Sequence, residues 1–325
     1  MGSASGPPQS FGGIPQITHA LQQQGYIAGH DVALSIHLSV VLRKPLLIEG
    51  AAGVGKTEVA KVMARALDTD LIRLQCYEGL DVHTALYEWN YQRQMLRIKL
   101  EEASDRPAEE KEHLIFSEPF MLKRPLLQAI TADRAPVLLI DEIDRADEEF
   151  EAFLLEVLSD FQVSIPEIGT IRARHIPHVV LTSNRTRDLS DALRRRCLYV
   201  WIDYPSFDKE LAIIHRKVPE INDRLANQIG AFMQLVRRVP LDKIPGIAET
   251  LDWSAALLAL HRDHLDPTAV EETLGCLCKD QEDLTRVRTQ YLRPILDSID
   301  VVGQSDDGWN AERIASLAAQ LPKGR

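Results

Sequence analysis

The sequence predicts an α/β domain with a parallel five-stranded sheet, followed by a smaller domain made only of helices. Three observations lead to this fold class. Five short apolar runs alternate with segments of helical periodicity as far as Pro205. After Pro205 the strand-like runs end and helical periods continue. A glycine-containing loop joins the first apolar run to a helix, at the sheet edge where such folds bind ligands.

Each predicted strand is a nearly continuous apolar run, which is typical of strands covered on both faces. The strands are expected within the segments 44–50, 68–78, 135–144, 178–184 and 198–205. Helices are expected at 31–42, 56–67 and 147–161, and a hairpin at 163–177 that turns near Gly169. The acidic segment 101–112 is interpreted as an exposed loop or a solvated helix end.

The domain boundaries follow from these changes of pattern. The first residues, MGSASGPPQSFGGIP, are rich in Gly, Ser and Pro and predict a flexible tail over 1–16. The α/β domain is expected over 17–205 and the helical lid domain over 206–325.

Composition restricts the partners and the compartment. A net charge of −11 disfavours nucleic acid, because phosphate contacts need a basic surface. No apolar run is long enough to span a membrane, and no signal peptide is visible. The four cysteines match no zinc-binding spacing. We therefore expect a cytoplasmic protein, either free or attached peripherally to a membrane.

The loop GAAGVGKT at 50–57 matches the phosphate-binding pattern G-x-x-x-x-G-K-[ST]. Its glycines let the backbone turn tightly and direct N–H groups at phosphate oxygens, next to the positive end of a helix. Lys56 is expected to reach the β- and γ-phosphates and Thr57 to hold Mg²⁺. A chance match in a glycine-containing turn is the weaker alternative, because a strand precedes the loop and a helix follows it.

A second motif, VLLIDEID, ends the third strand in two carboxylates. Asp141 is suited to bind Mg²⁺ through water, and Glu142 is suited to orient and polarise the attacking water. A solvated acidic strand end is the alternative. The upstream phosphate loop favours the catalytic interpretation.

Two further candidates lie at the ends of later elements. Asn184 follows the strand HVVLTS and would hold the γ-phosphate or the water, although Asn is also a common turn residue. The run Arg194, Arg195 and Arg196 precedes the last strand. Such a run is either a surface patch or an arginine finger presented to the γ-phosphate of a neighbouring subunit.

Taken in order, GAAGVGKT, VLLIDEIDRAD, FLLEVLSDFQV, LTSN and ALRRRC resemble an AAA+ ATPase. The segment from SEPFMLKRPLL to SIPEIG resembles the MoxR group. LYEWNYQRQMLRIKL and ETLDW are similar to its CoxD branch, whose members accompany molybdenum-containing carbon monoxide dehydrogenase. The similarity covers roughly residues 17–300.

The resemblance implies a role for each motif. Asp141 and Glu142 would be Walker B, Asn184 sensor 1, and Arg196 or Arg195 the finger. Walker A and its flank would comprise Gly50, Ala51, Ala52, Gly53, Val54, Gly55, Lys56, Thr57 and Glu58. ATP and Mg²⁺ would bind at the interfaces of a hexameric ring. MoxR proteins are associated with remodelling and metal-cofactor insertion, usually beside a partner with a von Willebrand A domain.

One position departs from the family pattern. The lid helix usually carries a sensor-2 arginine, and its place in TLDWSAALLAL falls on Ala255. Loss of this cation is expected to weaken sensing of the γ-phosphate. Either Arg237 or Arg238 substitutes, or the protein binds or hydrolyses ATP poorly.

The region 78–100 and the hairpin 163–177 are the candidates for holding a client. The first region combines Tyr87, Trp89 and Tyr91 with the cations Arg93, Arg97 and Lys99. Exposed aromatic side chains beside cations suit a protein partner. Packing of these aromatic residues into a local core, on one face of a strand, is slightly favoured.

Three classes of function compete at this point. The leading interpretation is an ATP-driven remodelling enzyme for a client metalloenzyme. A nucleotide-gated scaffold with slow hydrolysis is the alternative that Ala255 supports. A DNA motor is disfavoured by the acidic pI of about 5.4. GTP is disfavoured because the sequence contains no N-K-x-D motif.

Overall fold

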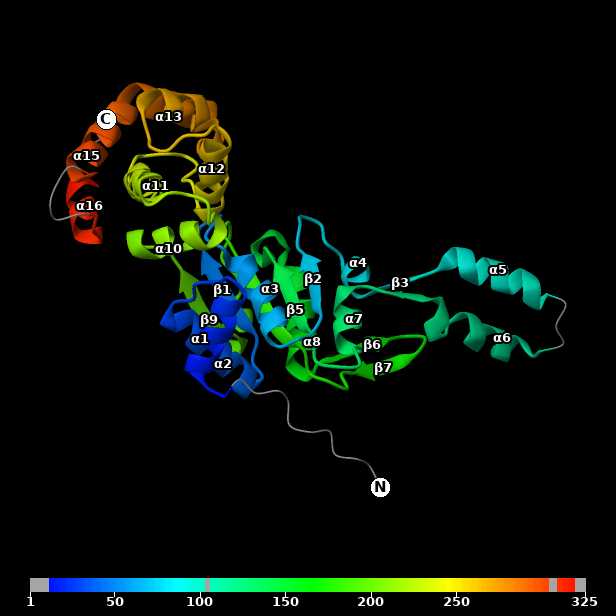
Figure 1. The fold of residues 1–325 in the computed structure, drawn as a ribbon. Coiled ribbons are helices and arrows are strands. Elements are labelled where there is room, and N and C mark those ends of the chain that lie inside the picture. Colours follow the sequence, from blue (N-terminus) through cyan, green and yellow to red (C-terminus); the bar gives the residue numbers. More distant parts are fainter. Residues whose placement is uncertain (1–11, 103–105, 304–308, 319–325) are drawn as a thin grey trace. The chain divides into compact units, whose positions relative to one another are not determined.

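The computed structural model describes residues 12–102, 106–303 and 309–318, which form two compact units (Figure 1). The first unit contains the described parts of Met1–Gln24, Ala28–Gly50 and Lys56–Trp201. The second contains those of Gly25–Ile27, Ala51–Gly55 and Ile202–Arg325.

A five-stranded sheet is the framework of the first unit, and it confirms the predicted fold class. The strand order is β2-β5-β8-β1-β9. The strands are β1 Leu46–Gly50, β2 Leu71–Gln75, β5 Val137–Asp141, β8 His178–Ser183 and β9 Leu198–Ile202. Parallel registers such as Leu47 with Leu181 and Leu139 with Val180 bring the carboxyl ends of β1, β5 and β8 to one edge.

The two outer strands differ from the sequence expectation. All five strands were expected to be buried on both faces, and β1 and β5 are buried along their whole length. Strand β9 instead alternates between exposed and buried residues, and β2 is buried only at Leu74, because both strands lie at the edges of the sheet. This exposes Tyr199 and Trp201 on β9.

Helices cover the sheet and extend the first unit. Helix α3 Lys56–Ala66 packs on β5, β1, β2 and β8, and α7 Pro125–Ile130 packs on β2 and β5. Helix α1 begins at Ile14, inside the predicted tail 1–16. Pro15 suits its first turn, and Ile17 is fully buried. The other helices of this unit are α2 His30–Leu42, α4 Val82–Leu86, α8 Glu148–Asp160, α9 Asp191–Arg196, and the 3₁₀ helices η1 Glu118–Phe120 and η2 Ile143–Arg145.

Two insertions leave the framework of the first unit. In the first, β3 Tyr87–Trp89 pairs antiparallel with β4 Met121–Lys123. Between these strands, α5 Tyr91–Glu101 and α6 Ala108–Ile115 extend away from the sheet as an arm (Figure 1). In the second, β6 Gln162–Ile165 and β7 Gly169–Arg172 form the predicted hairpin. Gly169 has φ +94°, which explains a glycine at the turn.

After Ile202, the described secondary-structure elements of the second unit are all helices. Its helices are α10 Phe207–Lys217, α11 Asp223–Val236, α12 Ile247–Ala259, α13 Pro267–Thr273, η3 Leu274–Cys276, α14 Gln281–Arg286, the π-helix η4 Val287–Tyr291, α15 Leu292–Gly303 and α16 Ala311–Ala318. The rings of Phe232 and Trp253 pack 5.0 Å apart in its core. The indole of Trp253 donates to Thr273 Oγ1 at 2.7 Å, so this buried polar group is satisfied.

Candidate nucleotide site

Lys56 opens α3 directly after the glycine-containing loop. Its side chain is buried, and its Nζ donates to the carbonyl of Gly50 at 2.9 Å. Burial lowers the pKa of the Lys56 ammonium, while the charges of Asp144, Asp141 and Glu142 act to raise it. Phosphate oxygens would form charge-assisted hydrogen bonds with this buried ammonium in place of the carbonyl.

The two predicted Mg²⁺ ligands meet in the structure. Thr57 Oγ1 donates to Asp141 Oδ1 at 3.0 Å, although the residues are 84 positions apart. Thr182 Oγ1, from β8, donates to the same carboxylate oxygen at 2.5 Å. Hydroxyl and carboxylate oxygens are the donors that Mg²⁺ prefers, and it needs only one or two protein ligands beside phosphate and water. The residues present therefore fit this ion.

Arg73 contacts the same carboxylate, and the sequence analysis missed it. Its Nε and Nη2 donate to Asp141 Oδ2 at 3.0 and 2.6 Å. Arg73 reaches Asp141 because β2 and β5 are neighbours, with Gln75 opposite Asp141. The available signal was a single cation inside the apolar run LIRLQ.

Glu142 has an unusual backbone and a cationic neighbour. Its φ of +55° lies in the left-handed region, and its N–H donates to Thr182 Oγ1 at 3.0 Å. Strained backbone of this kind is often found at functional sites. The Glu142 carboxylate pairs with Arg145 Nε at 3.1 Å and is one third exposed, so water has access to it.

A buried carboxylate fixes the residues around Asn184. Asp144 accepts hydrogen bonds from the backbone N–H groups of Asn184, at 3.2 Å, and Thr186, at 2.9 Å. The Asn184 side chain makes no hydrogen bond with the residues that the structure describes. Its position just beyond β8 leaves the amide available to a ligand at the carboxyl edge of the sheet.

Cys76 follows β2 at the carboxyl edge of the sheet, but its thiol is unreactive. Burial and, to a smaller extent, the charges of Asp141, Asp144 and Glu142 raise the pKa of its thiol to about 12. The thiol therefore stays protonated at neutral pH and offers no nucleophile.

The three arginines of α9 have different surroundings. Arg194 is half-buried and pairs with Glu49 at 3.2 Å and with Asp188 at 3.7 Å. Arg195 and Arg196 are exposed, and neither forms an ion pair within the described part of the chain. Glu58, the last residue of the predicted nucleotide-binding segment, pairs with Arg65 at 2.8 Å and with Lys61 at 3.5 Å on α3.

The loop residues Ala51–Gly55 belong to the second unit and contact the start of α12. The N–H of Ile247 donates to the carbonyl of Gly53 at 2.9 Å. A Cβ atom on Gly246 would lie 2.7 Å from the backbone of Gly53, so this close approach requires glycine. Gly53 and Gly55, with φ of +75° and +94°, also adopt conformations that favour glycine.

Arg237 is fully engaged within the second unit. Its guanidinium donates to both carboxylate oxygens of Glu210 at 2.7 Å and to the carbonyl of Pro245 at 2.9 Å. It also lies 5.0 Å from the centre of the Tyr204 ring. Glu210 is completely buried, so withdrawing Arg237 would leave an unpaired charge. Arg237 is thus a structural cation and a poor substitute for the arginine expected at 255.

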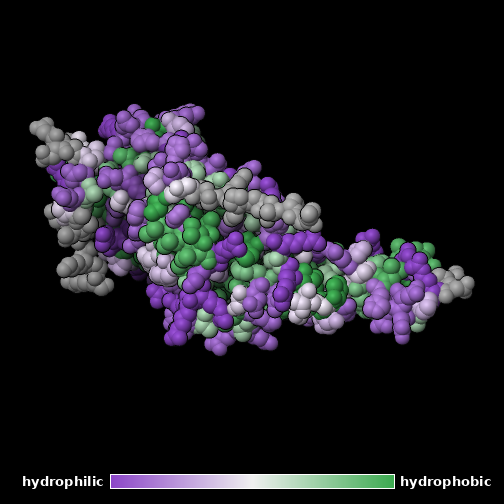
Figure 2. Space-filling model, turned by 90° about the horizontal axis from the view of Figure 1, so that it is seen from below, coloured by the Kyte–Doolittle hydropathy of each residue, from purple (hydrophilic) through white to green (hydrophobic). Residues whose placement is uncertain are grey.

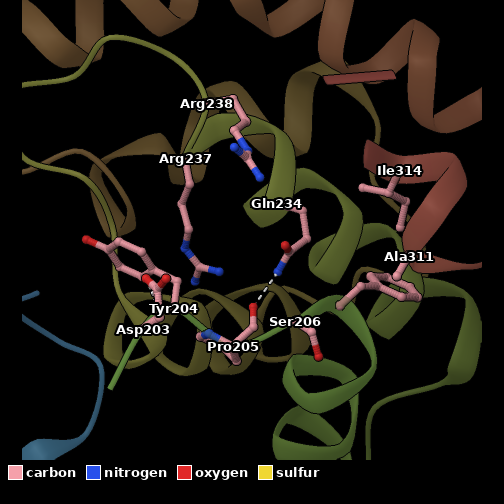
Figure 3. Close-up of a pocket in the computed structure, with 10 residues that line it drawn as sticks. Asp203, Tyr204, Pro205, Ser206, Gln234, Arg237, Arg238, Ala311 and Ile314 are labelled. Atoms are coloured by element: carbon pink, nitrogen blue, oxygen red, sulfur yellow. Dashed lines mark hydrogen bonds between the residues drawn. The ribbon is translucent and has the colours of Figure 1, made fainter. Parts of the chain in front are cut away.

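Arg238 remains the candidate for that substitution. Figure 3 shows it beside Arg237 at the end of α11, on a pocket of about 460 Å³. The pocket is lined by Asp203, Tyr204, Pro205, Ser206, Phe207, Gln234, Arg237, Arg238, Ala311 and Ile314. Arg238 is exposed and forms no ion pair with the described residues.

Ala255 is exposed on α12, the helix whose first residue contacts the glycine loop. Ala255→Arg is expected to raise ATP affinity or turnover by about 10-fold, the effect of one charge-assisted hydrogen bond to phosphate. Titration with a fluorescent ATP analogue and a phosphate-release assay measure the two quantities. Ala259→Arg, also exposed on α12, is the matched control. Equal behaviour of both variants would show that position 255 has no part in phosphate sensing.

Comparison with known proteins agrees with this geometry. Residues 45–197 match the AAA domain of the dynein-related subfamily. Over 227 residues, the chain is 26% identical to an uncharacterised protein of Staphylococcus aureus strain bovine RF122 / ET3-1. The match covers 67% of this chain and 77% of that protein, and a protein of strain NCTC 8325 / PS 47 gives the same values.

Among solved structures, the chain is similar to the Thermotoga maritima RuvB Holliday junction branch migration motor, with 18% identity and a TM-score of 0.44. The similarity covers 94% of this chain and 89% of that one. In the described ranges, no helix is long and apolar enough to cross a bilayer. Residues 45–197, which include Lys56, Thr57 and Asp141, are thus similar to an AAA domain.

Proposed function

We propose that this chain hydrolyses ATP in the presence of Mg²⁺. The observation that carries the proposal is the hydrogen bond between Thr57 and Asp141, which joins the phosphate loop to the carboxylate expected to hold the ion. When bound, Mg²⁺ would neutralise charge on the phosphates. Lys56 would bind the β- and γ-phosphates, Glu142 would orient and polarise the attacking water, and the Asn184 amide would hold the water or the γ-phosphate.

We also propose that the protein acts as a homo-oligomeric ring, a hexamer by its resemblance to MoxR proteins. Arg195 and Arg196 support this proposal, because both are exposed and unpaired within the described residues, whereas adjacent Arg194 is paired. One of the two, Arg196 or Arg195, would stabilise negative charge at a neighbour's γ-phosphate. A surface patch serving solubility alone is the competing explanation.

The work driven by ATP is proposed from the resemblance to the CoxD branch. It is the remodelling or maturation of a client metalloenzyme, such as a molybdenum-containing carbon monoxide dehydrogenase, in the cytoplasm. A protein with a von Willebrand A domain would be its partner. A nucleotide-gated scaffold with slow hydrolysis is the second candidate. It is favoured by Ala255 together with the full engagement of Arg237 by Glu210.

Phosphate release by the purified chain tests the activity. We expect turnover with ATP and Mg²⁺, none with EDTA, and stimulation by a client or by a von Willebrand A partner. ATP binding and ring formation without stimulated turnover would favour the scaffold. Salt-dependent DNA binding would instead favour a DNA motor.

The arm offers a surface for the client. This surface is not formed by the whole aromatic triplet Tyr87, Trp89 and Tyr91 that the sequence suggested. Tyr87 and Trp89 are buried, with ring centres 5.8 Å apart, as the core-packing interpretation predicts. Tyr91 is instead 67% exposed at the start of α5. The other exposed apolar side chains of α5 are Met95, Leu96, Ile98 and Leu100, and Figure 2 shows apolar surface on the arm.

Tyr91, Met95 and Ile98 share one side of α5, at spacings of four and three residues. Replacing all three with Ala is expected to abolish stimulation of turnover by the client while basal turnover stays within about two-fold, since surface changes rarely alter stability. Trp89→Ala is the contrasting control and should destabilise the fold by about 3–5 kcal/mol. Phosphate release and thermal melts measure both. Full stimulation of the triple variant would exclude this face.

A further inference from the structure

Glu49 is a buried carboxylate with no role in the proposed reaction. It is completely buried near the end of β1, one residue before Gly50. The carbonyl of Gly50 accepts the hydrogen bond from Lys56 Nζ. Glu49 is therefore the last side chain of the sheet before the phosphate loop begins.

Three polar side chains from three different segments surround Glu49. Arg194, on α9, donates to Oε1 at 3.2 Å, and Tyr199, on β9, donates to Oε2 at 3.1 Å. Arg185 Nε, from the segment after β8, lies 3.7 Å from Oε2. Burial and the charge of Glu49 raise the pKa of the Tyr199 phenol, so it remains a donor at neutral pH.

These contacts link parts of the candidate site that are distant in sequence. Arg185 directly follows Asn184 and has a left-handed backbone, with φ +57°. Its guanidinium also lies 6.0 Å from the centre of the Trp201 ring. Arg194 directly precedes Arg195 and Arg196, and adjacent Leu193 is fully buried. One carboxylate, one residue before Gly50 of the phosphate loop, thus contacts both the segment that follows Asn184 and the arginine helix α9.

We propose that Glu49 is a positioning residue that couples nucleotide binding in one subunit to the arginines which that subunit presents to its neighbour. The inference rests on the proposed ring and arginine finger. Glu49 directly precedes Gly50, so the transfer of Lys56 from the Gly50 carbonyl to phosphate would act on the backbone next to Glu49. Arg194 carries that response to α9, because its guanidinium is paired with Glu49.

The competing explanation is a purely structural ion-pair cluster. A carboxylate buried this deeply needs its partners for folding, whatever else it does. The two explanations differ in which subunit is affected. A structural role changes stability and nucleotide binding in the variant subunit itself, whereas the positioning role lowers turnover in the neighbouring subunit.

Mixed rings separate these effects. Donor subunits carry Glu142→Gln, so that only the unchanged subunits turn over and the donors supply arginines. Donors that also carry Glu49→Gln are expected to lower turnover by at least about 10-fold, a smaller loss than that expected for donors with Arg195→Ala and Arg196→Ala. Their own binding of a fluorescent ATP analogue should change by less than about two-fold, since Lys56 is retained.

Asp283→Asn is the matched control, since Asp283 is a completely buried carboxylate of the second unit that accepts the N–H of Lys243 at 2.9 Å. Full turnover with Glu49→Gln donors, combined with lost turnover for donors that carry Arg195→Ala and Arg196→Ala, overturns the inference. The arginine-finger proposal would still stand. If the arginine-variant donors also leave turnover unchanged, both the arginine-finger proposal and this inference are excluded. If Glu49→Gln does not fold, donors with Tyr199→Phe replace it. This variant removes one hydrogen bond to Glu49 and keeps every charge, and lost or full turnover in the neighbouring subunit is interpreted in the same way.

Discussion

A Glu142→Gln variant is expected to bind ATP as tightly as the unchanged chain and to lose hydrolysis by about 10²- to 10⁴-fold. The amide preserves the size of the side chain but cannot accept a proton from water. The binding residues Lys56 and Thr57 are untouched, and the backbone N–H of Glu142 can still donate to Thr182. Binding and turnover should therefore separate in this variant.

Equilibrium titration with a fluorescent ATP analogue and single-turnover phosphate release measure the two properties. Glu156→Gln removes the same charge from an exposed position of α8 and serves as the control. Hydrolysis within about three-fold of the unchanged chain would exclude Glu142 as the group that activates water, since that role is worth far more. A pulldown with the Glu142→Gln ring, held in its ATP-bound state, would then identify the client.

Motifs that are continuous in the sequence were predictable. Lys56, Thr57, Asp141 and Glu142 each follow or end an apolar run, and a parallel sheet brings such strand ends to one edge. The sequence therefore predicted that Thr57 and Asp141 would meet, and the structure places them 3.0 Å apart. Their roles in ATP binding and hydrolysis remain predictions.

Contacts that depend on the lateral order of the strands were not predictable. Arg73 reaches Asp141 because β2 is the neighbour of β5, and Glu49 reaches Tyr199 because β9 is the neighbour of β1. An apolar run shows that a strand exists but not which strand lies beside it. The same limit explains β9, whose exposed Tyr199 and Trp201 belong to an edge strand.

Replacing Arg195 and Arg196 together with Ala is expected to reduce turnover by about 10³-fold or more, with nucleotide binding to the variant's own loop retained. Both guanidinium groups are exposed on α9, and the hydrogen bond between Thr57 and Asp141 does not involve them. The loss should therefore be relieved in mixed rings with Glu142→Gln subunits, which supply arginines to variant neighbours but do not hydrolyse ATP.

The matched control is Arg224→Ala with Arg293→Ala, which removes two exposed arginines of the second unit. Single variants then assign the finger, because only a guanidinium that reaches the neighbour's γ-phosphate affects the transition state. If the double variant turns over normally in a ring of unchanged size, the arginine run is a solvated patch. Catalysis would then depend only on residues within one subunit. If turnover falls and the Glu142→Gln subunits do not restore it, the arginines act within their own subunit and the shared site is excluded. Recovery with Glu142→Gln subunits, which supply arginines but do not hydrolyse ATP, is the result that only a site completed by its neighbour can produce.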